Sequence, residues 1–446
     1  MKHIIIPSLA ALSLGTAVYA ENMTLYTDPA TGQVFTQDGE NRIKMGEFVD
    51  AKSLETSERK PTTVENPDSP EFLLGRETAP NMKFTASDNP DMWIKLGVRL
   101  QGTFENYRED YKDGTPDVDA WDFYLRRVRF EVSAGFTKHI SFTMDIRDDK
   151  ANYRDKGEQE FNVGDAYLNI KKPFDSSLVN FKLYRGKIDI SRDETVKSAY
   201  VLYYDRPHVA DEAAQFISHN RRGDNIAMYG DWHKKVHYQI AAGDGIYSGK
   251  FEDARGDVLP GDMTQKNLFY GGKVVLSPFD GWEETKRTET YFGKGRHFEI
   301  GAAYWKSPGI AYDDGLGVAQ TIDHELINLE MSAHYKGAFI QAEYFDFNGV
   351  VKEWGSPETG RSKGWYATGE YVIGELAYLA PFLRYEKWNK WEDESGWDLE
   401  SKIAGVNWYL RGNSTKVGLV VQEDTYGKEI GDYTDTRFKV TSQWFF

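Results

Sequence analysis

Residues 437–446 read RFKVTSQWFF, and their side chains alternate in polarity with a period of two. One parity is mainly apolar and the other is polar or charged: Phe438, Val440, Trp444 and Phe446 against Arg437, Lys439, Thr441 and Gln443. Because a β-strand shows successive side chains to opposite faces, the stretch predicts a strand with one apolar and one polar face. An aromatic ending of this kind is typical of a membrane-spanning barrel, with apolar side chains toward lipid and polar ones toward the lumen.

The composition of the 446-residue chain fits a single large all-β barrel, with 12 Trp, 27 Tyr and 25 Phe. Its mean hydropathy of -0.61 does not argue against a barrel, whose loops and lumen face are polar. The chain has no cysteine, which excludes disulfides and thiolate metal ligands. The net charge of -16 argues against nucleic acid as a partner.

Residues 1–20 predict a cleaved secretory signal peptide. Lys2 lies in a short basic region, and the apolar run over residues 4–18 is followed by small residues before Glu21. A retained anchor helix is the alternative, but this run is shorter than the roughly 20 residues that a membrane helix needs.

Residues 21–91 are expected to form a separate periplasmic N-terminal part. Its beginning, 23–36, predicts a hairpin around the turn residues at 28–32. A polar, proline-containing linker follows over 50–90. We expect the transmembrane barrel to occupy residues 92–446.

Sixteen runs with a period-two pattern make up this barrel region, and they predict an antiparallel barrel of sixteen strands. Fourteen or eighteen strands are the alternatives, through a miscount in the connections 191–223 or 278–295. The sixteen runs cover residues 92–107, 121–136, 139–148, 161–171, 178–190, 224–232, 235–246, 266–277, 296–307, 323–336, 338–348, 363–373, 376–388, 398–411, 414–425 and 435–446. Most links after even-numbered runs are very short, whereas those after odd-numbered runs are long, which is typical of short periplasmic turns and long external loops. The even link at 278–295 is an exception in being long. Pro381, inside the thirteenth run, predicts a bulge.

Several short motifs within the runs carry a common resemblance. They are FYLRRVRF (123–130) followed by Gly135, DAY (165–167), RGK (185–187), SPF (277–279) and NWYLRGN (407–413). In this order, over 92–446, they resemble the phosphate-selective porin O and P family.

This resemblance implies a homotrimeric, sixteen-stranded porin in the outer membrane of a Gram-negative bacterium. Its partners would be outer-membrane lipid and lipopolysaccharide, small anions or polar solutes, and the insertion machinery that reads a terminal aromatic, here Phe446. The third external loop of the family folds into the pore, which corresponds here to 191–223. Unlike the family pattern, this chain is acidic overall and has no lysine-dense loop.

Parity independently predicts which charged side chains line the lumen. The basic set forms one arc across the closing seam: Lys95, Arg99, Arg127, Arg129, Arg147, Arg185, Lys187, Arg384, Lys416, Arg437 and Lys439. The acidic set forms an opposite arc: Glu299, Glu330, Glu343 and Glu370. Charged arcs of opposite sign would select polar solutes by field and width, and the basic arc favours a mild preference for anions. Alternatively, each charge is only a solvated residue balanced by its neighbour.

The predicted inward loop contributes three further candidates, Arg206, Arg221 and Arg222. As constriction cations they would suit phosphate or carboxylate oxygens, because guanidinium groups bind such oxygens in a fork geometry. The alternative is that they pair with acidic residues of the loop and stabilise its fold.

A secreted or periplasmic carbohydrate-active or lectin-like β protein is a second class that the composition allows. A third is an aromatic-lined channel for sugars or organic anions, with Tyr200, Tyr203 and Tyr204 as its stacking platform. Catalytic signals are weak: the chain has no Gly-x-Ser-x-Gly motif and its nine His lack metal-ligand spacing. No enzyme activity and no cofactor are therefore expected. Calcium could bind acidic external loops at 110–119 and 313–315, although such runs are more often solvated turns.

Overall fold

The computed structural model describes residues 23–27, 34–35, 39, 43–48, 82–151, 161–218, 222–244, 253–255, 264–265, 267–279, 288–292, 296–313, 319–353, 358–376 and 378–445. The chain divides into two compact units, Met1–Pro67 and Asp68–Phe446. The signal peptide predicted over residues 1–20 lies outside the described residues.

The first unit contains a small antiparallel sheet with the strand order β2-β1-β3. Its strands are β1 (Met23–Thr27), β2 (Val34–Phe35) and β3 (Ile43–Phe48). β1 and β2 pair through Tyr26 and Phe35, over the stretch where the sequence predicts a hairpin. β3 adds a third strand on the other side of β1.

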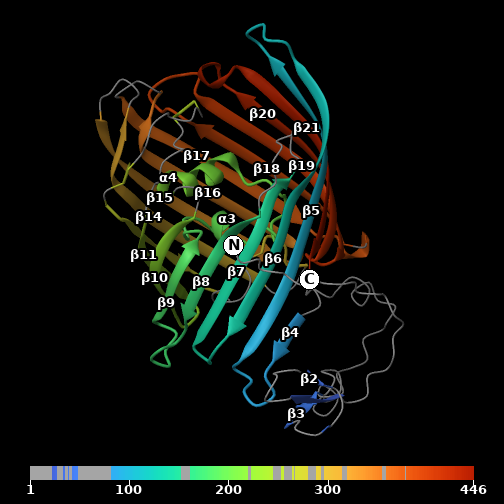
Figure 1. Ribbon diagram of the computed structural model, residues 1–446. Helices are drawn as coiled ribbons and strands as arrows, with labels where there is room; N and C mark the ends of the chain where they lie inside the picture. Colours follow the sequence, from blue (N-terminus) through green and yellow to red (C-terminus); the bar gives the residue numbers. More distant parts are fainter. Residues whose placement is uncertain are drawn as a thin grey trace, which may run out of the picture. The chain divides into compact units, whose positions relative to one another are not determined.

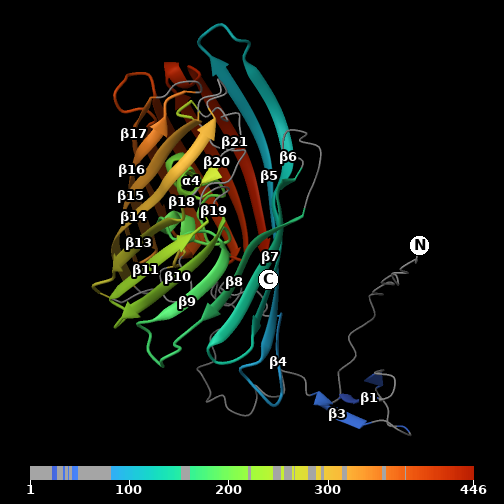
Figure 2. The same cartoon turned by 60° about the vertical axis from the view of Figure 1, so that its left-hand side comes forward.

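The second unit contains a closed antiparallel barrel of sixteen main strands (Figures 1 and 2). These are β5 (Trp93–Tyr111), β6 (Val118–Gly135), β7 (Ile140–Ala151), β8 (Asn162–Ile170), β9 (Asn180–Gly186), β10 (Gly223–Trp232), β11 (Val236–Gly243), β13 (Phe269–Leu276), β14 (Arg296–Asp313), β15 (Ala319–Tyr335), β16 (Ala338–Val351), β17 (Thr359–Tyr371), β18 (Leu379–Asn389), β19 (Asp398–Arg411), β20 (Thr415–Tyr426) and β21 (Tyr433–Phe445). Each overlaps one of the sixteen predicted runs, so the predicted fold class is confirmed.

Short elements complete the barrel unit. β4 (Met82–Thr85) pairs with β5, upstream of the predicted start of the barrel, and β12 (Thr264–Gln265) pairs with β14. Two 3₁₀ turns, η3 (Gly374–Leu376) and η4 (Lys428–Ile430), lie in connections. No helix of the described residues is long and apolar enough to cross a membrane.

The terminal strand β21 closes the barrel by pairing with β5, with Lys439 opposite Glu105. Its two faces follow the predicted parity, since Phe438 and Trp444 are 42% and 51% exposed on the outside while Lys439 is 1% exposed inside. The bulge predicted at Pro381 is absent: β18 pairs with β19 in regular register through Pro381. Its pairing with β17 ends at Phe382, so the missing N–H of the proline breaks no hydrogen bond there.

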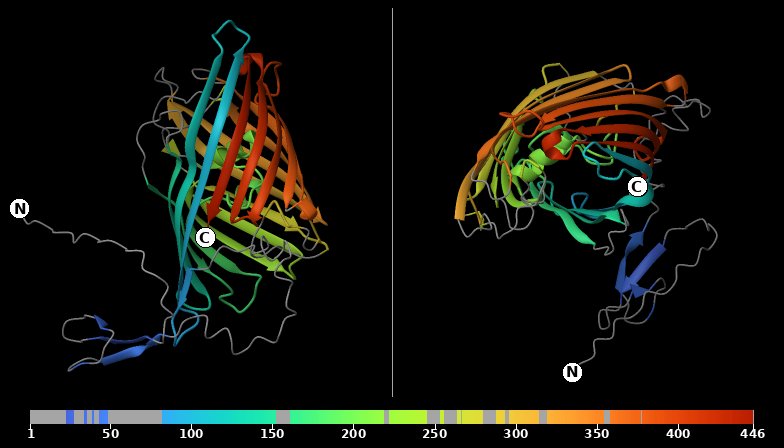
Figure 3. Two further views of the ribbon diagram at one scale, coloured as in Figure 1. Left: turned by 90° about the vertical axis from the view of Figure 1, so that its right-hand side faces the viewer. Right: turned by 90° about the horizontal axis from the view of Figure 1, so that it is seen from above.

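The connection between β9 and β10 folds into the barrel. It carries α3 (Arg192–Thr195) and α4 (His208–Ile217), which lie inside the ring of strands when the barrel is viewed along its axis (Figure 3). We call residues 187–222 the inserted segment, of which 219–221 lie outside the described residues. The inserted segment leaves free only part of the space that the strands enclose.

Candidate functional site

The inserted segment is held against one side of the barrel wall by an apolar contact. The buried face of α4 contains Val209, Ala210, Ala213, Ala214, Phe216 and Ile217. It packs on inward side chains of β14–β18, among them Trp305, Phe347 and Trp388. These wall positions are apolar although they face the lumen, because a helix covers them instead of water.

Wall side chains satisfy the backbone groups at both ends of α4. The N-cap position, Pro207, makes no side-chain capping bond, and the Glu386 carboxylate instead accepts the N–H groups of His208 (2.9 Å) and Val209 (2.6 Å). At the other end, the Ser307 hydroxyl donates to the Ile217 carbonyl at 2.7 Å. A carboxylate at a helix N-terminus also stabilises the helix dipole, so the wall fixes the helix orientation.

Arg192 of α3 is a fully buried anchor, with a relative exposure of 0%. Its Nε donates to Glu299 at 2.9 Å and its Nη1 to Gln341 at 2.6 Å, on β14 and β16. Its Nη2 donates to the Thr288 carbonyl at 2.8 Å and to the Tyr291 hydroxyl at 3.0 Å. Thr288 and Tyr291 belong to the long even link that the sequence shows at 278–295. The inserted segment is therefore bound by both the wall and this second connection.

Asp205 joins the inserted segment to strands on both sides of the closing seam. Its carboxylate accepts from Arg126 Nε (2.9 Å) and Lys439 Nζ (2.7 Å), and its carbonyl accepts from Arg384 Nη1 (2.7 Å). Burial alone would raise the pKa of Asp205, but Lys439 and Arg126 outweigh it and hold that pKa well below its usual range. The carboxylate therefore stays charged and neutralises cations that would otherwise face the lumen.

His208, at the start of α4, gives the attachment a pH dependence. Burial lowers its pKa, but the Asp424 carboxylate at 3.2 Å outweighs this and raises the pKa to about 9, with a smaller contribution from Glu386 and an opposing one from Arg437. The pKa of His208 in the folded protein lies above the ordinary value of about 6.5, so its ion pair with Asp424 stabilises the attachment fully below that pH. This stabilisation is lost as the pH rises through about 9.

We expect current noise from motion of the inserted segment to increase between pH 8 and pH 10 in single-channel recordings, because His208 loses its charge over this range. The variant His208→Asn should be noisy already at neutral pH and should change little with pH. Equal pH dependence in both proteins would contradict this role of His208.

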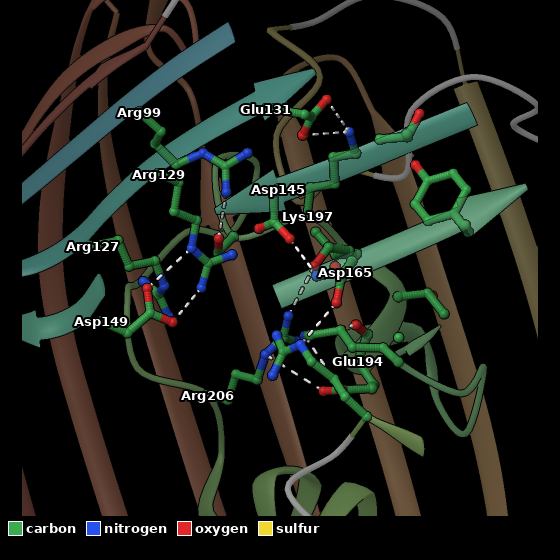
Figure 4. Close-up of a pocket in the computed structure, with 18 of the residues that line it drawn as sticks. Arg99, Arg127, Arg129, Glu131, Asp145, Asp149, Asp165, Glu194, Lys197 and Arg206 are labelled. Carbon is green, nitrogen blue, oxygen red and sulfur yellow. Dashed lines mark hydrogen bonds and ion pairs between the residues drawn. The ribbon is translucent and has the colours of Figure 1, made fainter. Parts of the chain in front are cut away.

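A cavity of about 810 Å³ lies between the inserted segment and the wall formed by β5–β11. We call it the lumen passage. Eleven basic and six acidic side chains line it, so its lining carries a net positive charge in a chain of net charge -16. In Figure 4, guanidinium groups of Arg99, Arg127, Arg129 and Arg206 converge on the same space as the carboxylates of Asp149 and Asp165.

Most of the lining cations are paired with carboxylates. Arg129 binds Asp149 at 3.0 Å, and Arg222 binds Asp165 at 2.8 Å. Lys197 binds Glu131, Lys187 binds Glu194, and Arg206 binds Asp193. Each such pair has no net charge, so it contributes little to the electrostatic field in the lumen passage.

Four lining cations have no carboxylate within ion-pair distance among the described residues: Arg99, Arg127, Lys171 and Lys182. Arg127 donates to Gln101 (2.8 Å) and to the Tyr204 carbonyl (3.0 Å), which are neutral acceptors. Arg99 donates to the Ser198 hydroxyl at 2.8 Å. These cations therefore supply the positive field of the lumen passage.

Five lining cations are absent from the predicted set: Arg126, Lys150, Lys171, Lys182 and Lys197. Arg126 lies on the lipid-facing parity of β6, but the β5–β6 register shifts between Gln101 and Gly102, and this bulge lets Arg126 reach Asp205 inside. Lys182 of β9 lies inside with its Nζ 4.5 Å and 4.1 Å from the ring centroids of Tyr167 and Tyr184. The Arg-Arg pair in the sequence was the available signal for the bulge, since it places two charges at consecutive strand positions.

The predicted basic residues fall into three groups. Those that line the lumen passage are Arg99, Arg127, Arg129, Lys187, Arg206 and Arg222. Those that bind inserted-segment backbone or Asp205 are Arg384, Lys416 and Lys439. Lys95, Arg147 and Arg437 do not border the lumen passage, and the last two bind Asp145 and Asp435. Arg221 lies outside the described residues.

Arg185 corrects the predicted parity of β9. It is exposed on the same face as Leu183, whereas Tyr184 is 5% exposed inside. The prediction extended the strand to residue 190 and placed Arg185 on the inward parity. β9 ends at Gly186, and Ile188 and Ile190 are buried in the core around α4.

The predicted acidic arc faces inward but does not border the lumen passage. Glu299 binds Arg192, and Glu343 accepts the Asp193 N–H at 2.7 Å. Glu330 pairs with Lys273 at 2.7 Å, and Glu370 accepts from the Tyr409 hydroxyl at 2.6 Å. The inserted segment covers this side of the wall, so these carboxylates stabilise packing there and do not face a permeating solute.

Two other predictions concern loop residues, namely the tyrosine stacking platform and the calcium sites. Tyr203 and Tyr204 are each 2% exposed between the inserted segment and the wall, so they offer no open stacking platform. Within the described ranges, no group of three or more His, Asp or Glu is arranged to hold a metal ion. Asp314 and Gly315 lie outside those ranges, and a loop calcium site stays a prediction.

A closed sixteen-stranded barrel with an apolar outside, a charged interior and an inserted external segment defines an outer-membrane channel. The chain matches the phosphate-selective porin O and P family over residues 94–429 and belongs to it. This assignment leaves the lectin-like alternative without support.

Individual relatives are distant in sequence. A protein of Aquifex aeolicus described as uncharacterized is 24% identical over 405 residues, covering 84% of this chain and 92% of that protein. The channel DcaP of Acinetobacter baumannii aligns over 81% of this chain and 99% of its own, with a TM-score of 0.55 and 10% identity. An anion-selective porin from Comamonas acidovorans aligns over 79% and 99%, with a TM-score of 0.52 and 10% identity. These two structures share the fold with this chain.

Proposed function

We propose that this outer-membrane channel carries small hydrophilic solutes by passive diffusion, with a mild preference for anions such as phosphate. The observation that supports the preference is the net positive lining of the lumen passage in an acidic chain. Four cations there lack carboxylate partners among the described residues, so the field is not cancelled locally. Passive diffusion needs neither catalysis nor a cofactor, and none is proposed.

We expect the purified channel to be anion-selective in planar bilayers. In a tenfold KCl gradient the sign of the reversal potential should show that chloride is more permeable than potassium, because an uncompensated positive lining attracts anions and repels cations. The preference should weaken as salt rises from about 0.1 M to about 1 M, where the Debye length falls to about 3 Å. Cation selectivity at low salt would overturn the proposal.

The assembly and membrane partners are part of the same proposal. We infer a homotrimer surrounded by outer-membrane lipid and lipopolysaccharide, which is the assembly that the family resemblance implies. Recognition of the terminal aromatic by insertion machinery concerns Phe446, outside the described residues. Chemical cross-linking of native outer membranes, followed by electrophoresis without boiling, would test the trimer.

A further inference from the structure

The lining of the lumen passage changes character along its length. One part, the arginine zone, consists of Arg126, Arg127, Arg129, Lys150 and Arg206. The first three lie in the middle of β6, Lys150 lies near the end of β7 that leads to a long connection, and Arg206 comes from the inserted segment. Long connections mark the external end of such a barrel, so the arginine zone occupies the external half and middle.

The other part, the amide zone, consists of Asn169, Lys182, Tyr229, His237 and Gln239. These residues lie near the periplasmic ends of four neighbouring strands, β8–β11. Asn169 pairs in register with Lys182, and Tyr229 pairs with Gln239. The amide zone is therefore one continuous patch of the wall.

Three polar groups of the amide zone, on Asn169, Tyr229 and Gln239, are available to a solute. The side-chain amides of Asn169 and Gln239 and the hydroxyl of Tyr229 make no hydrogen bond to another residue in the described part of the chain. Lys182 lies against two tyrosine rings and has no carboxylate partner among those residues. Amides and hydroxyls both donate and accept, as sugar hydroxyls do, and a tyrosine ring offers an apolar surface to a sugar ring.

We propose that the preferred solute is a hydroxylated organic anion of the sugar-phosphate class. Its phosphate would bind in the arginine zone at Arg127, which has neutral acceptors and no carboxylate partner among the described residues, and its hydroxyls would bind in the amide zone. The volume of about 810 Å³ lies within the range of roughly 300–1,000 Å³ typical of small-molecule sites. This inference rests on the proposed anion preference. It adds to that preference the recognition of the uncharged, hydroxylated part of the solute.

The test compares block of chloride current through the purified channel by glucose 6-phosphate, inorganic phosphate and glucose. Glucose 6-phosphate should block at a concentration about tenfold lower than phosphate, which corresponds to about 1.4 kcal/mol and is within reach of one or two added hydrogen bonds. Glucose should block weakly. Equal block by phosphate and glucose 6-phosphate would overturn this inference and leave the anion preference intact, whereas cation selectivity with no block would overturn both.

Variants locate the neutral part of the site. Gln239→Leu and Tyr229→Ala should bring the glucose 6-phosphate block close to that of phosphate while phosphate block stays unchanged. Tyr270→Ala, on the exposed outer face of β13, is the matched control and should behave as the unmodified channel. A preference for glucose 6-phosphate that persists in both amide-zone variants would contradict the assignment. The wild-type comparison decides the proposal even where a variant fails to fold.

Discussion

Replacing Arg127 and Lys182 together by glutamine should reduce the chloride-to-potassium permeability ratio about tenfold. A unit charge about 6 Å from an ion in water contributes about 0.7 kcal/mol, and about half of this remains at about 0.1 M salt. Removing one charge changes the energies of chloride and potassium in opposite directions, so the ratio changes about three- to fourfold per charge. Reversal potentials of the double variant in a low-salt KCl gradient measure the effect.

The matched control removes a cation together with its carboxylate. Arg129 and Asp149 bind each other at 3.0 Å, so the pair Arg129→Gln and Asp149→Asn leaves the net charge of the lumen passage unchanged. We expect its reversal potential to stay near that of the unmodified channel. An equal loss of selectivity in both double variants would show that each cation acts only by filling space.

The alternation of apolar and polar side chains in the sixteen main strands was predictable, because lipid imposes the same rule on every strand. An outward position must be apolar and an inward position meets water, so the period of two extends along the whole barrel region. The same rule places Lys439 and Glu105 on the inward face, and the structure pairs them across the closing seam. The strands can therefore be located in the sequence without knowing what fills the barrel interior.

The candidate site was less predictable because the same rule fails wherever protein replaces lipid or water. Ile188 and Ile190 are apolar but pack inside, which reversed the predicted orientation of Arg185. Arg126 enters the lumen through a bulge that a strict period of two cannot represent. Glu299 and Glu343 point inward as predicted, yet their partners come from α3, whose placement depends on contacts distant in sequence.

Replacing Arg192 by methionine should release the inserted segment from the wall and raise single-channel conductance about twofold or more, since an open barrel of this size encloses an aqueous channel. Removing one partner of a buried ion pair costs about 3–5 kcal/mol, because the remaining charge stays buried without compensation. Here Glu299 is 0% exposed and would lose the Arg192 guanidinium while keeping its contacts with His297 at 3.1 Å and Ser332 at 3.2 Å. Anchors at Asp205 and Glu386 hold the segment elsewhere, so its α3 part should move most.

A double variant distinguishes the effect of leaving the Glu299 charge buried from the effect of losing the Arg192 contacts. Adding Glu299→Gln to Arg192→Met removes the carboxylate that has lost its Arg192 partner, and we expect it to recover part of the lost thermal stability and to reduce the excess conductance. The exposed pair of Lys402 and Glu423 on the outer face serves as control, because exposed ion pairs contribute about 0–1 kcal/mol. Unchanged conductance in Arg192→Met, with a normally folded barrel, would mean that the apolar face of α4 alone keeps the inserted segment in place. The barrel strands should remain paired in every variant, since their hydrogen bonds do not involve Arg192.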